Sequence, residues 1–225
     1  MEHAGRTGGL PFVGVGWYRT EFDVPQFQAG KRATILFDGA MSHANVYING
    51  QKVGYWPYGY NSFHFDITKY LKPGEKNTLA VRLENLPESS RWYPGAGLYR
   101  NVHLIITEDA YIPVWGTYIT TPSVNEKFAK VNVRTKVVLP EGADPAKYSV
   151  ETSVWNPNKQ KLTAVRTSLA QMKYNNNQAE QEFVIQAPSL WSPEMPALYS
   201  AETRLYEGDK LKDIYTTPFG IRSIE

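Results

Sequence analysis

Apolar and polar residues alternate at every second position along most of this 225-residue chain. An extended strand places successive side chains on opposite faces, so each alternating run predicts a strand with one buried face. No long segment shows the 3.6-residue periodicity of an amphipathic helix. The pattern therefore predicts an all-β fold. The clearest runs cover residues 18–22, 44–48, 79–84, 131–137 and 148–154.

Two short segments between these runs predict specific turns. Asn49-Gly50 joins the run ending at Ile48 to residues 51–53. Asn-Gly supplies the two positive φ angles of a type I′ turn, so we expect a tight β-hairpin there. The segment Asp66 to Leu71 is too short for a full helix and precedes Pro73-Gly74. We expect one helical turn, capped by Asp66.

The chain restarts its strand pattern once, which predicts two domains. Residues 102–107 complete one alternating run, and Tyr111-Ile112-Pro113 begins a new stretch with a residue that does not continue a sheet interior. Further runs at 162–169, 179–185, 198–205 and 211–216 are spaced by turn residues about every ten positions, as in a β-sandwich. We predict a first domain over 1–109 and a second over 110–225.

Composition excludes several classes of function. Lys and Arg number 24 against 22 Asp and Glu, and the basic residues are scattered, which argues against a nucleic-acid partner. The absence of cysteine excludes disulfides, thiolate metal sites and cysteine nucleophiles. No apolar run approaches the roughly 18 residues of a membrane span, and residues 1–10 lack the apolar centre of a signal peptide. We expect no membrane association.

Candidate catalytic groups are scarce. Hydrolysis of a glycosidic bond needs two carboxyl groups about 5 to 10 Å apart across the scissile bond. Glu84 and Glu88 are the pair that could be nominated as acid and base, but neither lies in a segment that would bury it, which favours solvated carboxylates. We therefore expect no catalytic residue, no metal site and no cofactor. The histidines lack metal-ligand spacing; they are His3, His43, His64 and His103.

Aromatic side chains give better candidates for recognition. The segment 55–60 holds four large rings in six residues, more than one strand face can bury. Such rings suit the apolar C–H faces of sugars or a docking partner, and the alternative is that they fill the core or a domain interface. The rings are Tyr55, Trp56, Tyr58 and Tyr60.

A second cluster, Arg91-Trp92-Tyr93, combines a cationic fork with two rings and is followed by Pro94 to Gly97. That composition is typical of a rigid ligand loop, and a structural role is equally compatible with it. Trp17 and Arg19 lie on an early strand, where we expect a structural role with Arg19 pairing across strands.

The order of several motifs resembles the non-catalytic front half of glycoside hydrolase family 2, the β-galactosidase group. The first part is similar to the successive strands of the family's sugar-binding jelly-roll domain, and Gly97 to Val102 to its closing signature. Residues 190–199 resemble a segment of the following immunoglobulin-like domain, and residues 219–225 the entry into the catalytic barrel. The matching segments are 16–19, 36–40, 46–54, 65–68, 79–81, 97–102, 190–199 and 219–225.

The resemblance implies a jelly-roll domain followed by an immunoglobulin-like sandwich in an enzyme that hydrolyses terminal β-galactosides. Both catalytic glutamates of this retaining family belong to the barrel, so we expect this chain alone to be inactive and the barrel of the same polypeptide to be its partner. Family members usually have more jelly roll before the segment that begins at Gly16, so we expect the first domain to be truncated. A missing strand would leave a free sheet edge that a second copy of the chain could pair with, so a homo-oligomer is one expected possibility.

In the family, the loop before the closing signature reaches into the active site, often with Asp at the position of Arg91. The resemblance therefore implies that Arg91, Trp92 and Tyr93 shape the substrate site, with galactose favoured and another hexose not excluded. Two alternatives remain: a free-standing carbohydrate-binding module that uses the rings of 55–60, or a scaffold whose rings dock the barrel. The compartment stays unknown, with a bacterial periplasmic or extracellular location favoured over the cytoplasm.

Overall fold

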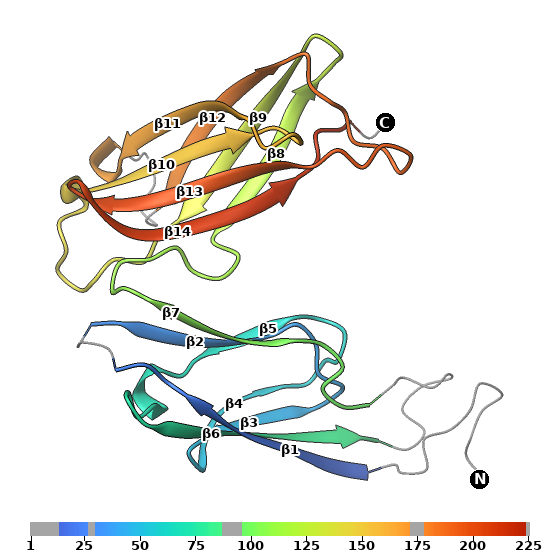
Figure 1. Ribbon diagram of the computed structural model, residues 1–225, viewed down its shortest axis with the longest axis vertical. Helices are drawn as coiled ribbons and strands as arrows, with labels where there is room; N and C mark the ends of the chain where they lie inside the picture. Colours follow the sequence, from blue (N-terminus) through green and yellow to red (C-terminus); the bar gives the residue numbers. More distant parts are fainter. Residues whose placement is uncertain (1–13, 27–29, 87–95, 172–177, 224–225) are drawn as a thin grey trace. The chain divides into compact units, whose positions relative to one another are not determined.

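A computed structural model describes residues 14–26, 30–86, 96–171 and 178–223. The chain forms two compact units that divide after Ile106, and each consists of β-sheets with short 3₁₀ turns (Figure 1). Within the described ranges, no helix is long and apolar enough to cross a membrane. The fold is all-β with two β-sandwich domains, as the alternation of the sequence predicts.

The first unit is a two-layer sandwich (Figure 1). A four-stranded sheet has the order β1-β6-β3-β4, and a three-stranded sheet has the order β5-β2-β7. Non-consecutive neighbours such as β1 and β6 show that the chain crosses repeatedly between the layers. The strands are β1 (Gly14–Asp23), β2 (Arg32–Phe37), β3 (Ala44–Ile48), β4 (Gln51–Trp56), β5 (Phe63–Asp66), β6 (Lys76–Asn85) and β7 (Val102–Thr107).

The core of this unit lies between its two sheets. Alternate residues of β3 and β6, including Val46 and Val81, are completely buried and meet the aromatic side chains of β2 and β5. Phe37 and Phe63 stack with ring centroids 4.8 Å apart, and Trp56 stacks on the same Phe63 at 5.6 Å. Stacked aromatic rings add to the burial of apolar area, so this cluster is central to the stability of the unit.

The predicted β-hairpin is confirmed. Ile48 pairs with Gln51 across the two-residue turn, in which Asn49 and Gly50 have φ angles of 50° and 80°. The predicted helical turn is a 3₁₀ turn over Thr68–Tyr70. The carboxylate of Asp66 accepts a hydrogen bond from the Thr68 backbone N–H at 2.9 Å, although the N-cap position is occupied by the next residue along the chain.

Strand β1 differs from the half-buried strand that its alternation predicts. It pairs with β6 over its whole length, yet Tyr18, which faces the same side as the buried Val81, is 42% exposed. Because β1 is the edge of the four-stranded sheet and the facing sheet has three strands, its inner face receives less cover. The sequence pattern specifies which side a residue faces, but not how far the opposite layer extends.

The second unit is a sandwich of a three-stranded sheet, β12-β9-β8, and a four-stranded sheet, β11-β10-β13-β14. This division of antiparallel strands is that of an immunoglobulin-like domain. Two buried clusters fill the space between the sheets, one around Val131 and Val154 and one around Val150 and Leu205. The strands are β8 (Thr117–Val124), β9 (Phe128–Lys136), β10 (Tyr148–Trp155), β11 (Lys161–Ser168), β12 (Gln178–Gln186), β13 (Tyr199–Glu207) and β14 (Lys210–Phe219).

Candidate carbohydrate-recognition site

Three loops of the first unit meet at one end of its sandwich. Met41 and Gly97 exchange two backbone hydrogen bonds of 3.0 Å, which fasten the loop after β2 to the segment before β7. The His43 N–H donates to the Pro57 carbonyl at 3.1 Å, which adds the loop after β4. Segments 38–43, 57–62 and 96–101 therefore form one continuous loop surface, which we call the loop end.

Small residues and one tyrosine hold the loop end together. The Tyr99 hydroxyl donates to the Gly59 carbonyl at 2.7 Å. The Tyr99 ring lies so close to Gly39 that a Cβ atom there would stand 2.7 Å from the ring. A Cβ at Gly59 would likewise collide with the Met41 sulfur. A side chain at either position would force Tyr99 or Met41 to move out of its present place.

The four rings predicted for recognition lie in three different environments: the loop end, the outer face of the sheet and the core. Tyr58 and Tyr60 project from the loop end, 53% and 50% exposed, with an edge-to-face contact at 5.6 Å. Tyr55 lies on the outer face of the sheet, where its hydroxyl shares a hydrogen bond of 2.6 Å with His43 Nδ1. Trp56 turns inward onto the core. Two of the four rings are thus available to a ligand at the loop end.

The predicted ligand-loop residues Arg91, Trp92 and Tyr93 lie outside the described residues, as does Glu88. The described residues on both sides of that segment are joined to the loop after β2 by hydrogen bonds. On one side the end of β6 is bound to the loop after β2, since the Glu84 N–H donates to the Ser42 carbonyl at 2.9 Å. On the other side stands Gly97.

Two of the described carboxyl groups, those of Glu84 and Asp213, have structural contacts. Glu84 is ion-paired with Arg82 on the outer face of β6. Burial raises the pKa of Asp213, but its two oxygens accept backbone N–H bonds of 2.8 Å each from Ile112 and Ile214, so it serves as a backbone clamp. In the part of the chain that the structure describes, no group of three His, Asp or Glu residues could hold a metal ion.

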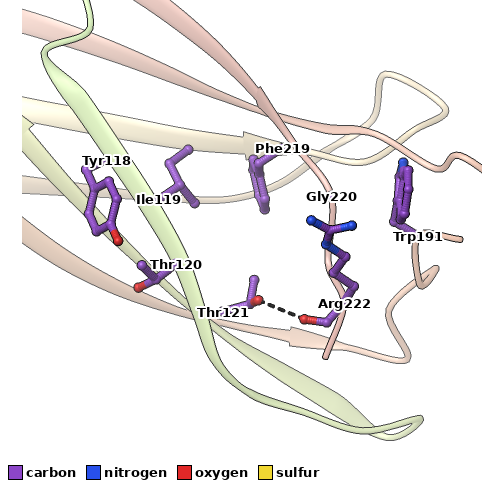
Figure 2. Close-up of a pocket in the computed structure, with 8 residues that line it drawn as sticks. All are labelled: Tyr118, Ile119, Thr120, Thr121, Trp191, Phe219, Gly220 and Arg222. Carbon is purple, nitrogen blue, oxygen red and sulfur yellow. Dashed lines mark hydrogen bonds between the residues drawn. The ribbon is translucent and has the colours of Figure 1, made fainter. Parts of the chain in front are cut away.

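The second unit carries a groove of about 670 Å³ between the edge strands of its two sheets (Figure 2). One wall is β8, and the other is the end of β14 with the segment that follows it. The Thr121 hydroxyl donates to the Arg222 carbonyl at 3.1 Å and joins the two walls. The lining residues are Tyr118, Ile119, Thr120, Thr121, Trp191, Phe219, Gly220 and Arg222.

The geometry of the groove depends on Trp191. Its backbone N–H donates to the Ile221 carbonyl at 2.8 Å, and the Arg222 guanidinium lies 4.8 Å from its ring centroid. Figure 2 shows the Arg222 side chain beside Trp191. A Cβ at Gly220 would stand 3.0 Å from the Trp191 side chain. Sequence reasoning did not assign a groove to these residues. The signal was present in the motifs at 190–199 and 219–225, because residues of the two motifs contact one another here.

Taken together, the chain is a pair of β-sandwich modules in series with a ring-bearing loop end on the first. The family model described as "Glycosyl hydrolases family 2, sugar binding domain" matches residues 11–108, and the model "Glycosyl hydrolases family 2" matches residues 111–222. The chain belongs to glycosyl hydrolase family 2.

Named relatives agree with this assignment. The chain is 40% identical to the β-galactosidase BoGH2A of Bacteroides ovatus, covering 99% of this chain and 26% of that protein. It is 37% identical to a putative β-glucuronidase of Formosa agariphila, covering 98% and 20%. A crystal structure of a family 2 member from Bacteroides cellulosilyticus superimposes with a TM-score of 0.84 at 33% identity, covering 94% and 27%. The chain thus corresponds to the N-terminal region of family 2 glycosidases and to a minor part of their length.

Proposed function

We propose that this chain is the non-catalytic, substrate-shaping region of a β-galactosidase-like glycoside hydrolase, with domain limits at 1–109 and 110–225. In this proposal the segment that precedes Gly97 of the loop end contributes Arg91, Trp92 and Tyr93 to the substrate site of the catalytic barrel. The observation that carries the proposal is the double hydrogen bond between Met41 and Gly97, because it fastens the residues that follow the 87–95 segment to the end that exposes Tyr58 and Tyr60.

Two substrate classes compete for this site. One relative is named a β-galactosidase and another a putative β-glucuronidase. We favour a terminal β-galactoside because residues 90–97 as a block resemble β-galactosidases. Arg91 is the residue that argues for an acidic sugar instead, since a guanidinium binds a carboxylate through two parallel hydrogen bonds.

The test is a chimera in which this chain replaces the matching N-terminal region of the Bacteroides ovatus β-galactosidase. We expect hydrolysis of p-nitrophenyl β-galactoside by the chimera and none by the chain alone. Trp92→Ala in the chimera should raise KM or lower kcat/KM by about tenfold, the loss of roughly 1.4 kcal/mol of substrate binding. Trp115→Ala, at an exposed ring of the second unit, is the matched control and should leave both constants unchanged.

Three results would contradict parts of the proposal. Unchanged kinetics in Trp92→Ala would show that this loop does not contribute to the substrate site. A preference of the chimera for the β-glucuronide would replace galactose by a uronic acid. Turnover by the chain alone that disappears in Glu84→Gln or Glu88→Gln would show that the catalytic acids lie in this region.

A free-standing carbohydrate-binding module is the second candidate, and the exposed pair Tyr58 and Tyr60 favours it. It predicts glycan binding by the chain alone that is lost in Tyr58→Ala and kept in Trp92→Ala. A third candidate, a scaffold for the barrel, predicts no sugar affinity and tight association with a separately produced barrel fragment.

A further inference from the structure

The outer face of the four-stranded sheet in the first unit carries a second set of rings, away from the loop end. Trp17 of β1 and Tyr47 of β3 lie in contact, with ring centroids 5.5 Å apart and planes inclined by 38°. Strand β6 lies between them, and at this level it presents the small side chain of Ala80, which pairs with Tyr47. The two rings therefore close over β6 and form a bent apolar platform.

The Trp17 ring of this platform is open to solvent, while Tyr47 is half-buried. Trp17 is 59% exposed, although a tryptophan gains its stabilising effect from burial. Its side chain faces away from the core, because its partner in the sheet is the outward-facing Arg82, which is ion-paired with Glu84. Folding of the sandwich thus does not account for a large ring at this position.

Two cations stand beside the platform. Arg19 follows Trp17 by two residues and so lies on the same face, and Lys52 is paired with Tyr47 on the other side. Both side chains are exposed, and neither makes a hydrogen bond or an ion pair with another described residue. The expectation that Arg19 pairs across strands is wrong, because Ala80 lies opposite it.

We propose that Trp17, Tyr47, Arg19 and Lys52 form an accessory binding site for an acidic oligosaccharide built of uronic acid residues. The C–H face of a sugar ring stacks on aromatic side chains, and a carboxylate pairs with a guanidinium or an ammonium group. The bent ring pair supplies the first interaction and the two uncompensated cations supply the second. A neutral sugar would leave both cations without a counter-charge.

This site extends the sugar recognition proposed for the loop end but does not depend on it, because the two sites share no residue. The inference concerns binding alone and adds no catalytic step. It predicts that the two sites respond to different substitutions in the same protein.

The experiment is calorimetric titration of the chain with a tetragalacturonate at low salt, beside cellotetraose as a neutral chain of equal length. We expect binding of the acidic sugar that weakens at least tenfold in Trp17→Ala. Arg19→Gln should weaken binding severalfold and reduce its dependence on salt, since one fewer charge is neutralised. Trp115→Ala, at a tryptophan that is 55% exposed in the second unit, is the matched control and should bind as the parent chain does.

Folding of each variant is checked by its unfolding curve, and Arg19→Gln provides a test that removes no packed ring. The inference is overturned if no binding is detected at millimolar sugar, if cellotetraose binds equally well, or if Trp17→Ala has no effect. Loss of binding in Tyr58→Ala alone would place the sugar at the loop end instead. Sedimentation that shows self-association of the parent chain, abolished by Trp17→Ala, would make this face a protein interface and also overturn it.

Discussion

Trp56 and Tyr58 are two residues apart in the sequence, but the first is a core ring and the second is an exposed ring. Replacing each by alanine should therefore lower the free energy of unfolding by different amounts. Trp56 stacks on Phe63 at 5.6 Å and belongs to the core of the first unit. Truncation of a core tryptophan costs about 3 to 5 kcal/mol. Because Trp56 is part-exposed and its buried indole N–H has no hydrogen-bond partner among the described residues, only packing is lost. We expect a cost near the lower end, about 3 kcal/mol.

Tyr58 is 53% exposed, so Tyr58→Ala should cost less than about 1 kcal/mol. The assay is urea unfolding followed by tryptophan fluorescence and circular dichroism. With a denaturant slope of about 1.5 kcal/mol/M, 3 kcal/mol moves the midpoint of the first unit down by about 2 M, and Tyr58→Ala moves it by well under 1 M. The transition of the second unit should stay unchanged in both variants.

Equal midpoints for the two variants would refute this reasoning, because they would show that Trp56 does not pack into the core as described. A larger loss in Tyr58→Ala would refute it as well. A shift of both units in Trp56→Ala would mean that the two units unfold together, in which case the comparison between the variants still decides the question.

Two further perturbations test other parts of the molecule. Gly97→Ala should lower the free energy of unfolding by about 2 kcal/mol or more, because φ is +103° and a Cβ would stand 2.2 Å from the Tyr18 hydroxyl oxygen. The control Gly142→Ala, at φ +74° in open space, should lower it by only about 1 kcal/mol in the same thermal unfolding assay. Equal losses in the two variants would contradict the clash with Tyr18. A hydrogen bond from Lys212 chiefly lowers the pKa of Asp109, so this pair stabilises the fold above the unfolded pKa of about 4 and loses that effect as pH falls through the lower folded value. Lys212→Met should therefore cost about 1 kcal/mol at pH 7 after solvent screening, and it should lose less stability than the parent between pH 7 and pH 3; an unchanged pH profile of the melting temperature would count against the pair.

The strands and the tight turn follow from local patterns, which explains why the sequence predicts them. Asn49-Gly50 needs only its own φ angles and its two neighbouring runs to form the hairpin. The immunoglobulin-like unit likewise follows from regularly spaced alternating runs. The exposure of β1 could not be predicted in the same way, because it depends on how many strands the opposite sheet contains.

The faces on which Tyr55 and Trp56 lie depend on a β-bulge in β4 that the residue pattern does not predict. Counting alternate residues from the turn, with Gln51 opposite the buried Ile48, places Tyr55 inward and Trp56 outward. A β-bulge after Lys52 adds one residue to β4 and reverses that order, so that Trp56 pairs with the buried Ala44. One extra residue exchanges the two faces of a strand, and the composition of residues 51–56 does not predict where such a bulge occurs.

The same alternation that predicts the fold also separates residues that folding requires from residues that it does not. Inward positions of β3 and β6 are apolar because the core selects them, and polar residues suffice at their outward positions. Trp17 and Tyr47 occupy outward positions, and unpaired Arg19 lies on the same face. An exposed Trp17 in contact with the half-buried Tyr47, beside cations without a described partner, is therefore better explained by a ligand than by packing. The titration of Trp17→Ala against Trp115→Ala tests this reasoning directly.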